Sequence, residues 1–213
     1  MRNRIIILAL VLVLGLIGYF SLYTNKTENV QPIQKLNYTA EIQKYRSEKN
    51  EYLKTAKDSP VYEEDRLDFK GLSYFDADTA YRVRAYIAKY ETSIGIPIEM
   101  THGKPEFYKP FGNAIFSVKG QECRLILFKS EESQTIFVAF KDLTNNKLTY
   151  GGGRYIEIPR KSIKNDSLVI DFNYCFNPFC NYNPTYSCPV PPRENNLPIE
   201  ILAGERVFSY RNQ

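Results

Sequence analysis

The sequence contains no tryptophan and only one histidine, His102. The chain alone therefore cannot build a metal site that needs two or three histidines, and a catalytic triad with an imidazole would have to use His102. His102 stands beside Gly103 and Pro105 between two apolar runs, which predicts an exposed loop. Sugar-binding platforms often use tryptophan, so the 17 tyrosines and 13 phenylalanines are interpreted mainly as core residues, with tyrosine hydroxyls at its rim.

A strong charge of one sign is also missing. The formal net charge is +4, and Arg2 and Arg4 account for two of these charges, which leaves +2 on residues 5–213. No nucleic-acid partner is expected from such a balance. The 24% of charged and 43% of hydrophobic residues are ordinary for a globular chain and argue against disorder of the whole chain. The length of 213 residues allows one domain of ordinary size with an appendage.

The longest uncharged run is residues 5–23, IIILALVLVLGLIGYFSLY. As a helix it would be roughly 28 Å long, close to the hydrocarbon thickness of a bilayer. Arg2 and Arg4 precede it, so residues 1–4 are expected in the cytoplasm and the rest of the chain in the periplasm, on a single-pass inner-membrane protein. The alternative is a cleaved signal peptide, whose apolar part would be about 7–15 residues long, with small residues at the cleavage site. Both interpretations place the C-terminal domain outside the cytoplasm.

Three parts follow the predicted transmembrane helix. Residues 24–36 are polar and contain Pro32, which predicts a linker. Residues 37–66 are predicted to be a helical segment packed on the domain: residues 38–57 carry an amphipathic pattern, and Ser59-Pro60 is typical of the start of a second, short helix. Residues 67–213 are predicted to form a β domain.

In the predicted β domain, short runs rich in Val, Ile, Tyr and Phe alternate with turn-forming residues. Since no long helical pattern separates these runs, we predict a mainly β fold, an antiparallel sandwich or partly closed barrel with an N-terminal helix. Hairpin turns are predicted at residues 117–122 and 142–147. The predicted strands are 81–90, 96–101, 114–118, 122–128, 135–141, 154–158, 167–171 and 200–207.

Residues 173–196 show no usable period and are rich in Asn and Pro, with three of the four cysteines. A long loop of this kind inside a compact domain is usually functional or wrapped on its own side chains. We therefore predict an ordered, irregular loop that packs over one end of the sheet.

Several of these segments resemble the bacterial domain of unknown function 1684 family. They are YGGGRY (150–155), DFNYCFNPFCNYNPTYSCPVPPREN (171–195), AGE (203–205), FKGLSYFDADTAYRVRA (69–85) and FKDLTNNKLTYGGGRY (140–155). The resemblance covers about residues 40–210 and points to the branch of envelope proteins with an N-terminal signal or anchor. It implies no established activity. Cys180 and Cys188 match the family pattern, whereas Cys175 replaces a small residue and Cys123 is not a family cysteine.

The matching pair of cysteines is predicted to form a disulfide. Disulfides persist outside the cytoplasm, and closing the short loop between Cys180 and Cys188 would stabilise the domain by roughly 2–3 kcal/mol. A bond between Cys175 and Cys180 is one alternative, and buried free thiols are another. A thiolate metal site would need further ligands, which the chain barely has, so no metal is expected.

A run of three glycines precedes Arg154 and gives the predicted ligand site. Successive exposed amides and an adjacent guanidinium suit a carboxylate or phosphate, although the run lacks the ending of a Walker loop. The structural alternative is a bulged strand entry in which Arg154 pairs with Asp142 or Asp171. The predicted ligand-binding residues are Arg154, Gly151, Gly152, Gly153, Tyr150, Asn173, Asn177 and Asn195.

Asp142, Asp171 and Glu205 end predicted strands and are the candidate catalytic residues. Two of these carboxylates could carry out hydrolysis if they converged. The structural alternatives are an Asx turn at Asp171 and asparagines that satisfy the backbone of the Pro-rich loop. The leading hypothesis is a non-catalytic envelope domain that binds a small ligand or an envelope protein, without a cofactor. A hydrolase and a purely structural module are the alternatives.

Overall fold

The computed structural model describes residues 36–91, 94–130 and 134–208. The predicted membrane segment 5–23 and nearly all of the predicted linker 24–36 lie outside these ranges, so both stay predictions. Within the described ranges, no helix is both long and apolar enough to cross a membrane.

An α-helix, residues 36–55, opens the described chain close to the predicted 38–57. Near its end Leu53 is fully buried in a small apolar cluster. The helix ends at Thr55, and the hydroxyl of Ser59 donates to the Leu53 carbonyl of its last turn at 2.6 Å. The predicted second helix is wrong, because only one 3-10 turn follows, η1 (Glu63–Asp65).

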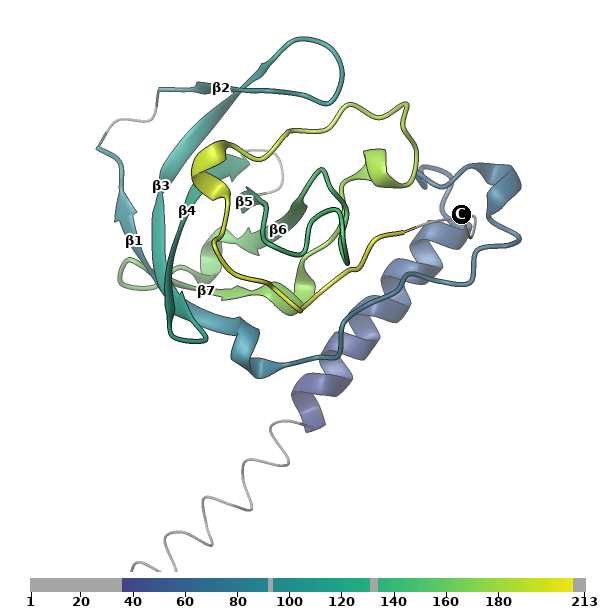
Figure 1. Ribbon diagram of the computed structural model, residues 1–213, viewed down its shortest axis with the longest axis horizontal. Helices are drawn as coiled ribbons and strands as arrows, with labels where there is room; N and C mark the ends of the chain where they lie inside the picture. Colours follow the sequence, from purple (N-terminus) through teal and green to yellow (C-terminus); the bar gives the residue numbers. More distant parts are fainter. Residues whose placement is uncertain (1–35, 92–93, 131–133, 209–213) are drawn as a thin grey trace, which may run out of the picture. The chain divides into compact units, whose positions relative to one another are not determined.

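Seven antiparallel strands form the centre of the fold. They pair in the order β6-β5-β4-β3-β1-β7, and β2 pairs with one end of β3. Figure 1 shows that the sheet curls on itself. The fold is therefore mainly β, a curled half-barrel with one N-terminal helix, and the partly closed barrel is the one of the two predicted architectures that is observed. The strands are β1 (Arg82–Lys89), β2 (Ile96–Ile98), β3 (Glu106–Val118), β4 (Gln121–Ser130), β5 (Thr135–Phe140), β6 (Arg154–Pro159) and β7 (Ser167–Asp171).

The strand bounds differ from the prediction mainly in two places. β3 begins at Glu106 rather than at residue 114, and continues through a bulge in which Phe111 has no partner on β4. Such a bulge tolerates the neighbouring Pro110 inside a strand. The predicted strand 200–207 is wrong, since the only β-pairing of this segment among the described residues is an isolated bridge between Tyr74 and Glu205.

β5 and β6 are buried on both faces. On one face Val138 and Ile156 belong to the main core, which the C-terminal segment covers with Ile201 and Ala203. On the other face Tyr155 joins a second apolar cluster with residues of the Pro- and Asn-rich loop. The sheet is thus a middle layer between two irregular segments.

The loop of residues 173–196 is ordered and irregular, as predicted. It is built from 3-10 turns and packs on the outer face of β5 and β6, where Phe176 pairs with Tyr155 at the edge of β6. The remaining 3-10 turns of the described chain are η2 (Thr79–Tyr81), η3 (Arg160–Ser162), η4 (Phe172–Tyr174), η5 (Phe179–Asn181) and η6 (Arg193–Asn195).

Candidate functional site

Arg154, the predicted anion contact, lies in the interior with a side-chain exposure of 0%. Its guanidinium donates to Asp142 Oδ2 at 2.7 Å. It also donates to three carbonyls of the C-terminal segment, those of Ile201, Ala203 and Glu205, at 2.8, 2.5 and 3.2 Å. Arg154 thus binds the C-terminal segment to the sheet, and its partner Asp142 is the one that the structural alternative named.

The carboxylate of Asp142 is equally engaged. Its Oδ1 accepts from the Thr144 amide at 2.8 Å, the Thr144 hydroxyl at 2.5 Å and the Ile201 amide at 3.3 Å. Because Oδ2 receives the guanidinium, every side of the carboxylate has a donor. Asp142 therefore organises the connection from β5 to β6.

The glycine run makes this connection tight. Gly153 has φ +96°, and a Cβ there would stand 2.6 Å from the Phe140 carbonyl oxygen. A Cβ on Gly151 would stand 1.9 Å from Asn146 Oδ1. At Gly151 and Gly153 the close approach that glycine permits is thus made by the protein's own atoms.

The three predicted asparagines are buried and bond to backbone groups, the structural alternative offered for them. The Asn173 side chain accepts from the Asp78 amide at 2.9 Å and donates to the Asp78 carbonyl at 2.8 Å. Asn177 donates to the Arg206 carbonyl at 2.8 Å. Asn195 bonds to the amide and carbonyl of Ile126 on β4 and to the Ala139 carbonyl on β5. Their side-chain amides thus replace the backbone hydrogen bonds of a neighbouring strand at points where strands diverge or end.

The carboxylates of Glu205 and Asp171 bond to other groups than that of Asp142. Glu205 Oε2 accepts from the Tyr182 hydroxyl at 2.5 Å and the Asn177 amide at 2.8 Å. Its Oε1 stands 2.5 Å from Lys49 Nζ, an ion pair whose angle departs from that of a hydrogen bond. Asp171 Oδ1 accepts from the Asn173 amide at 3.1 Å, which is the Asx turn that the sequence indicated.

Two cavities on the described domain show where a ligand has room. The smaller, about 360 Å³, is lined by Asp142 and Gly151 but by neither Asp171 nor Glu205. The larger, about 640 Å³, is lined by none of the three carboxylates. Neither cavity therefore holds a pair of the candidate catalytic residues.

All four cysteines are free thiols, so the predicted disulfide is not formed in this structure. Cys180 and Cys188 are nevertheless neighbours, since the Cys180 amide donates to Cys188 Sγ at 3.2 Å. The hydroxyl of Tyr150 lies 3.7 Å from Cys180 Sγ. A hydrogen bond from the Cys188 thiol, helped by Tyr150 and Thr101, lowers the pKa of Cys180 to about 6. The same bond, together with burial, raises the pKa of Cys188.

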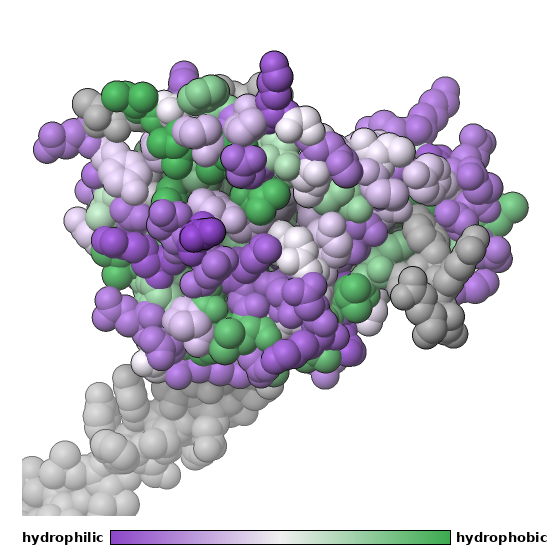
Figure 2. Space-filling model, turned by 45° about the horizontal axis from the view of Figure 1, so that its top comes forward, coloured by the Kyte–Doolittle hydropathy of each residue, from purple (hydrophilic) through white to green (hydrophobic). Residues whose placement is uncertain are grey.

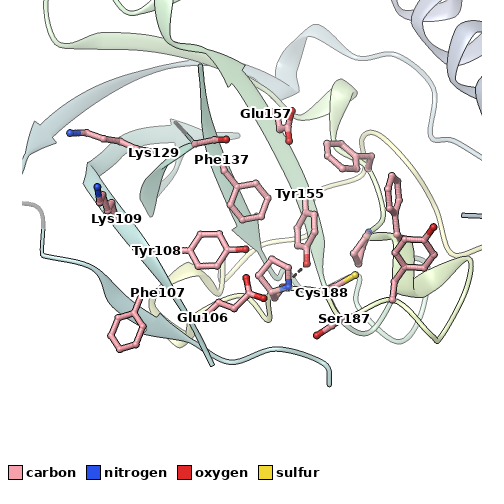
Figure 3. Close-up of a pocket in the computed structure, with 16 residues that line it drawn as sticks. Glu106, Phe107, Tyr108, Lys109, Lys129, Phe137, Tyr155, Glu157, Ser187 and Cys188 are labelled. Carbon is pink, nitrogen blue, oxygen red and sulfur yellow. Dashed lines mark hydrogen bonds between the residues drawn. The ribbon is translucent and has the colours of Figure 1, made fainter. Parts of the chain in front are cut away.

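The larger cavity, which we call the aromatic pocket, lies between the outer face of the sheet and the Pro-rich loop. Figure 3 shows Tyr108, Phe137 and Tyr155 across its centre, from β3, β5 and β6. The Phe137 ring packs edge-on against Tyr155, with centroids 4.9 Å apart. Tyr155 is fixed by its hydroxyl, which donates to the Pro189 carbonyl at 2.5 Å. The loop contributes the opposite side through Phe176, Phe179, Tyr186, Cys188 and Pro189.

Two lysines stand together at one side of the aromatic pocket (Figure 3). Lys109 and Lys129 are direct partners across β3 and β4. Like charges in directly opposed positions destabilise a strand pair. Within the described ranges neither lysine has an ion pair, and Lys129 Nζ only faces the Phe111 ring at 5.6 Å. Glu106 and Glu157 also line the pocket, so its charges are mixed, but the side with the two opposed lysines suits an anionic group.

The connection between β2 and β3 holds the loop wall of the pocket in place. The Thr101 amide donates to the Cys188 carbonyl at 2.8 Å, and the Cys188 amide donates to the Thr101 hydroxyl at 2.9 Å. His102 is exposed, as predicted, with Nε2 2.9 Å from the Pro184 carbonyl oxygen. Residues between β2 and β3 thus hold the loop of residues 173–196 in place at the pocket.

Sequence reasoning missed the pocket residues. Tyr108 falls in the part of β3 that the prediction omitted, and Phe137 and Tyr155 were assigned to the core with their neighbours. One signal was available: β5 and β6 are apolar at successive positions rather than at alternate ones, which indicates burial on both faces.

A curled antiparallel half-barrel with a buried arginine network and an aromatic pocket on its outer face defines a small β domain. The chain belongs to the family described as "Protein of unknown function (DUF1684)", which matches residues 67–206. It is also similar to the solution NMR structure of an uncharacterised protein from Haloarcula marismortui, with 36% identity and a TM-score of 0.64 over 81% of this chain and 96% of that chain. A search of curated proteins found no match. The predicted family is thus confirmed, while the bacterial origin stays a prediction.

Proposed function

We propose that the chain is a membrane-anchored, extracytoplasmic domain that binds a small organic ligand in the aromatic pocket without transforming it. The observation that carries the proposal is the pocket itself, about 640 Å³ and walled by aromatic rings from the sheet and the loop. A volume in this range and a mostly apolar lining with a few polar groups are usual for small-molecule sites.

The lining narrows the chemical class of the ligand. Ring faces such as those of Tyr108 and Phe137 stack on another flat ring. The opposed charges of Lys109 and Lys129, which have no ion pair within the described ranges, favour a carboxylate or phosphate on that ring, because an anion between them would relieve their repulsion. The proposed ligand is therefore a planar ring that carries an anionic group.

The surface supports a small ligand over a partner protein. On the face in Figure 2, hydrophobic residues stand in small groups among hydrophilic ones. Large exposed apolar side chains, such as Leu67 and Ile94, are scattered along the chain. Scattered residues of this kind are normal for a monomeric surface. The hydrolase alternative is weakened, because Asp142, Asp171 and Glu205 are each held by donors of the protein and no two of them line either of the two cavities described above.

Two related probes test the ligand proposal. The full chain in mild detergent is titrated by calorimetry with 1-naphthoate and with 1-naphthamide, its uncharged counterpart, and empty micelles serve as the blank. The double substitution Lys109→Gln and Lys129→Gln should weaken naphthoate binding roughly fivefold to tenfold and leave naphthamide unchanged. Tyr108→Ala should weaken both probes. Lys161→Gln, an exposed lysine of η3, is the matched control. Equal naphthoate affinity in the double variant and the control would refute the anion site, and no binding of either probe would favour the purely structural module.

The anchoring proposal rests on residues 5–23 and the two arginines that precede them. Added proteinase K should digest the domain in intact spheroplasts and leave a cytoplasmic marker protein whole. A chain without residues 1–23 should be protected under the same treatment. Protection of the full chain would place the domain on the cytoplasmic side and overturn the proposed topology.

A further inference from the structure

The thiols of Cys180 and Cys188 meet at the wall of the aromatic pocket. Cys188 is part of its lining, and its sulfur accepts the Cys180 amide at 3.2 Å. The Tyr150 hydroxyl lies 3.7 Å from the sulfur of Cys180, and the Cys188 thiol is its neighbour in the same apolar cluster. One proton shared between two sulfurs leaves a thiolate that these donors stabilise.

The other two cysteines provide a contrast within the same chain. Cys123 lies in the main core on β4, and burial raises its pKa. Cys175 is 1% exposed, and burial raises its pKa to about 11. Both belong to the main core, and neither lines the aromatic pocket. Thiolate character is therefore confined to the pair at the pocket.

We propose that Cys180 and Cys188 form a redox-active dithiol, which hydrogen peroxide oxidises and a thiol reductant restores. The inference is independent of the ligand proposed for the pocket. The sequence predicted a permanent structural disulfide between these residues, and we propose a reversible one instead. Hydrogen bonds that stabilise the thiolate stabilise the reduced form, so they make the disulfide easier to reduce.

The chemistry balances over two steps. The Cys180 thiolate attacks one peroxide oxygen, the O–O bond breaks, and the leaving hydroxide takes up a proton to become water, which leaves Cys180 as a sulfenic acid. The Cys188 thiol then attacks that sulfur, the S–O bond breaks, and the hydroxyl group leaves as a second water. The two thiols have lost two electrons to the peroxide. Cys180 is the attacking residue and Cys188 the resolving one.

Chemical trapping of the sulfenic acid distinguishes the attacking cysteine from the resolving one. The full chain in mild detergent is treated with hydrogen peroxide in the presence of dimedone, which labels sulfenic acids, and each cysteine is followed by peptide mass spectrometry. Cys188→Ser should accumulate the adduct at Cys180, at least about tenfold above the adduct at Cys188 in Cys180→Ser. Cys123→Ser is the matched control and should behave as the native chain, which forms the disulfide without a lasting adduct.

Two results would overturn the proposal. One is equal labelling of all four cysteines, which would show ordinary exposure-limited oxidation. The other is a Cys180–Cys188 disulfide that millimolar reduced glutathione does not open while the fold is intact, since that bond would be structural. If a serine variant does not fold, iodoacetamide footprinting of the native chain decides instead: at pH 6, Cys180 should react faster than the other three cysteines, and equal rates would refute the assignment.

Discussion

Replacing Arg154 by methionine should remove much of the stability of the domain. The side chain makes one charge-assisted bond to Asp142 and three bonds to carbonyls of the C-terminal segment, all without contact with water. Methionine keeps most of the volume and returns none of the donors. Removing one partner of a buried ion pair typically costs about 3–5 kcal/mol, because the remaining charge stays buried. Total stabilities of about 5–15 kcal/mol are usual, so the loss would be a large part of the whole.

Urea denaturation of the full chain, followed by far-ultraviolet circular dichroism, measures this loss. The matched control is Arg82→Met, because Arg82 also faces an aspartate, Asp171, but with a side-chain exposure of 53% and a distance of 3.4 Å. Exposed pairs contribute about 0–1 kcal/mol. Asp142→Asn combined with Arg154→Met should cost less than the sum of the two single changes, since the unpaired charge is gone. A loss for Arg154→Met no larger than for Arg82→Met would refute the structural role of Arg154.

Three more predictions concern the loops and the dithiol. Gly153→Ala should destabilise by about 3 kcal/mol or more and Gly103→Ala by only about 1 kcal/mol in the same urea assay, because both have positive φ but only a Cβ on Gly153 meets neighbouring atoms; equal losses would contradict this. Asn195→Ala should cost about 2–4 kcal/mol, since it strands the amide and carbonyl of Ile126 and a carbonyl of β5; a change within 0.5 kcal/mol would be too small for that role. Alkylation of Cys180 by iodoacetamide should rise with pH and reach half its plateau near pH 6, because a lowered pKa moves the appearance of the thiolate to lower pH; a midpoint near that of an ordinary cysteine would exclude the shared proton.

The local sequence pattern was sufficient for most of the strands but insufficient for β3 and for residues 200–207. Alternation predicts a strand wherever one face is buried, and β1 and β7 follow that rule. The pattern fails in β3 because the bulge at Phe111 shifts the register, and a bulge is a tertiary feature. It fails again at 200–207 because apolar residues there cover the core from outside the sheet.

The candidate site was harder to predict than the fold. The sequence around Arg154 does not distinguish an arginine that faces solvent from one that is buried. Only the path of the C-terminal segment places three carbonyls around its side chain. The aromatic pocket combines Tyr108, Phe137 and the Pro-rich loop, which are far apart in the chain. The spacing of neighbouring residues does not predict which distant segments come together in the fold. The closeness of Cys180 and Cys188 was predictable, because one short loop joins them.

The residues that make the chain recognisable are therefore poor guides to its ligand. An irregular segment leaves backbone amides and carbonyls without ladder partners, and each has to be satisfied by a side chain of suitable shape. Asn173, Asn195 and Arg154 do this work, and few other residue types offer the same donors in the same places. A pocket wall is less restrictive, because one aromatic ring replaces another with little loss. It follows that differences in function among similar chains should be sought at Lys109, Lys129 and the aromatic rings rather than in the glycine- and asparagine-containing motifs.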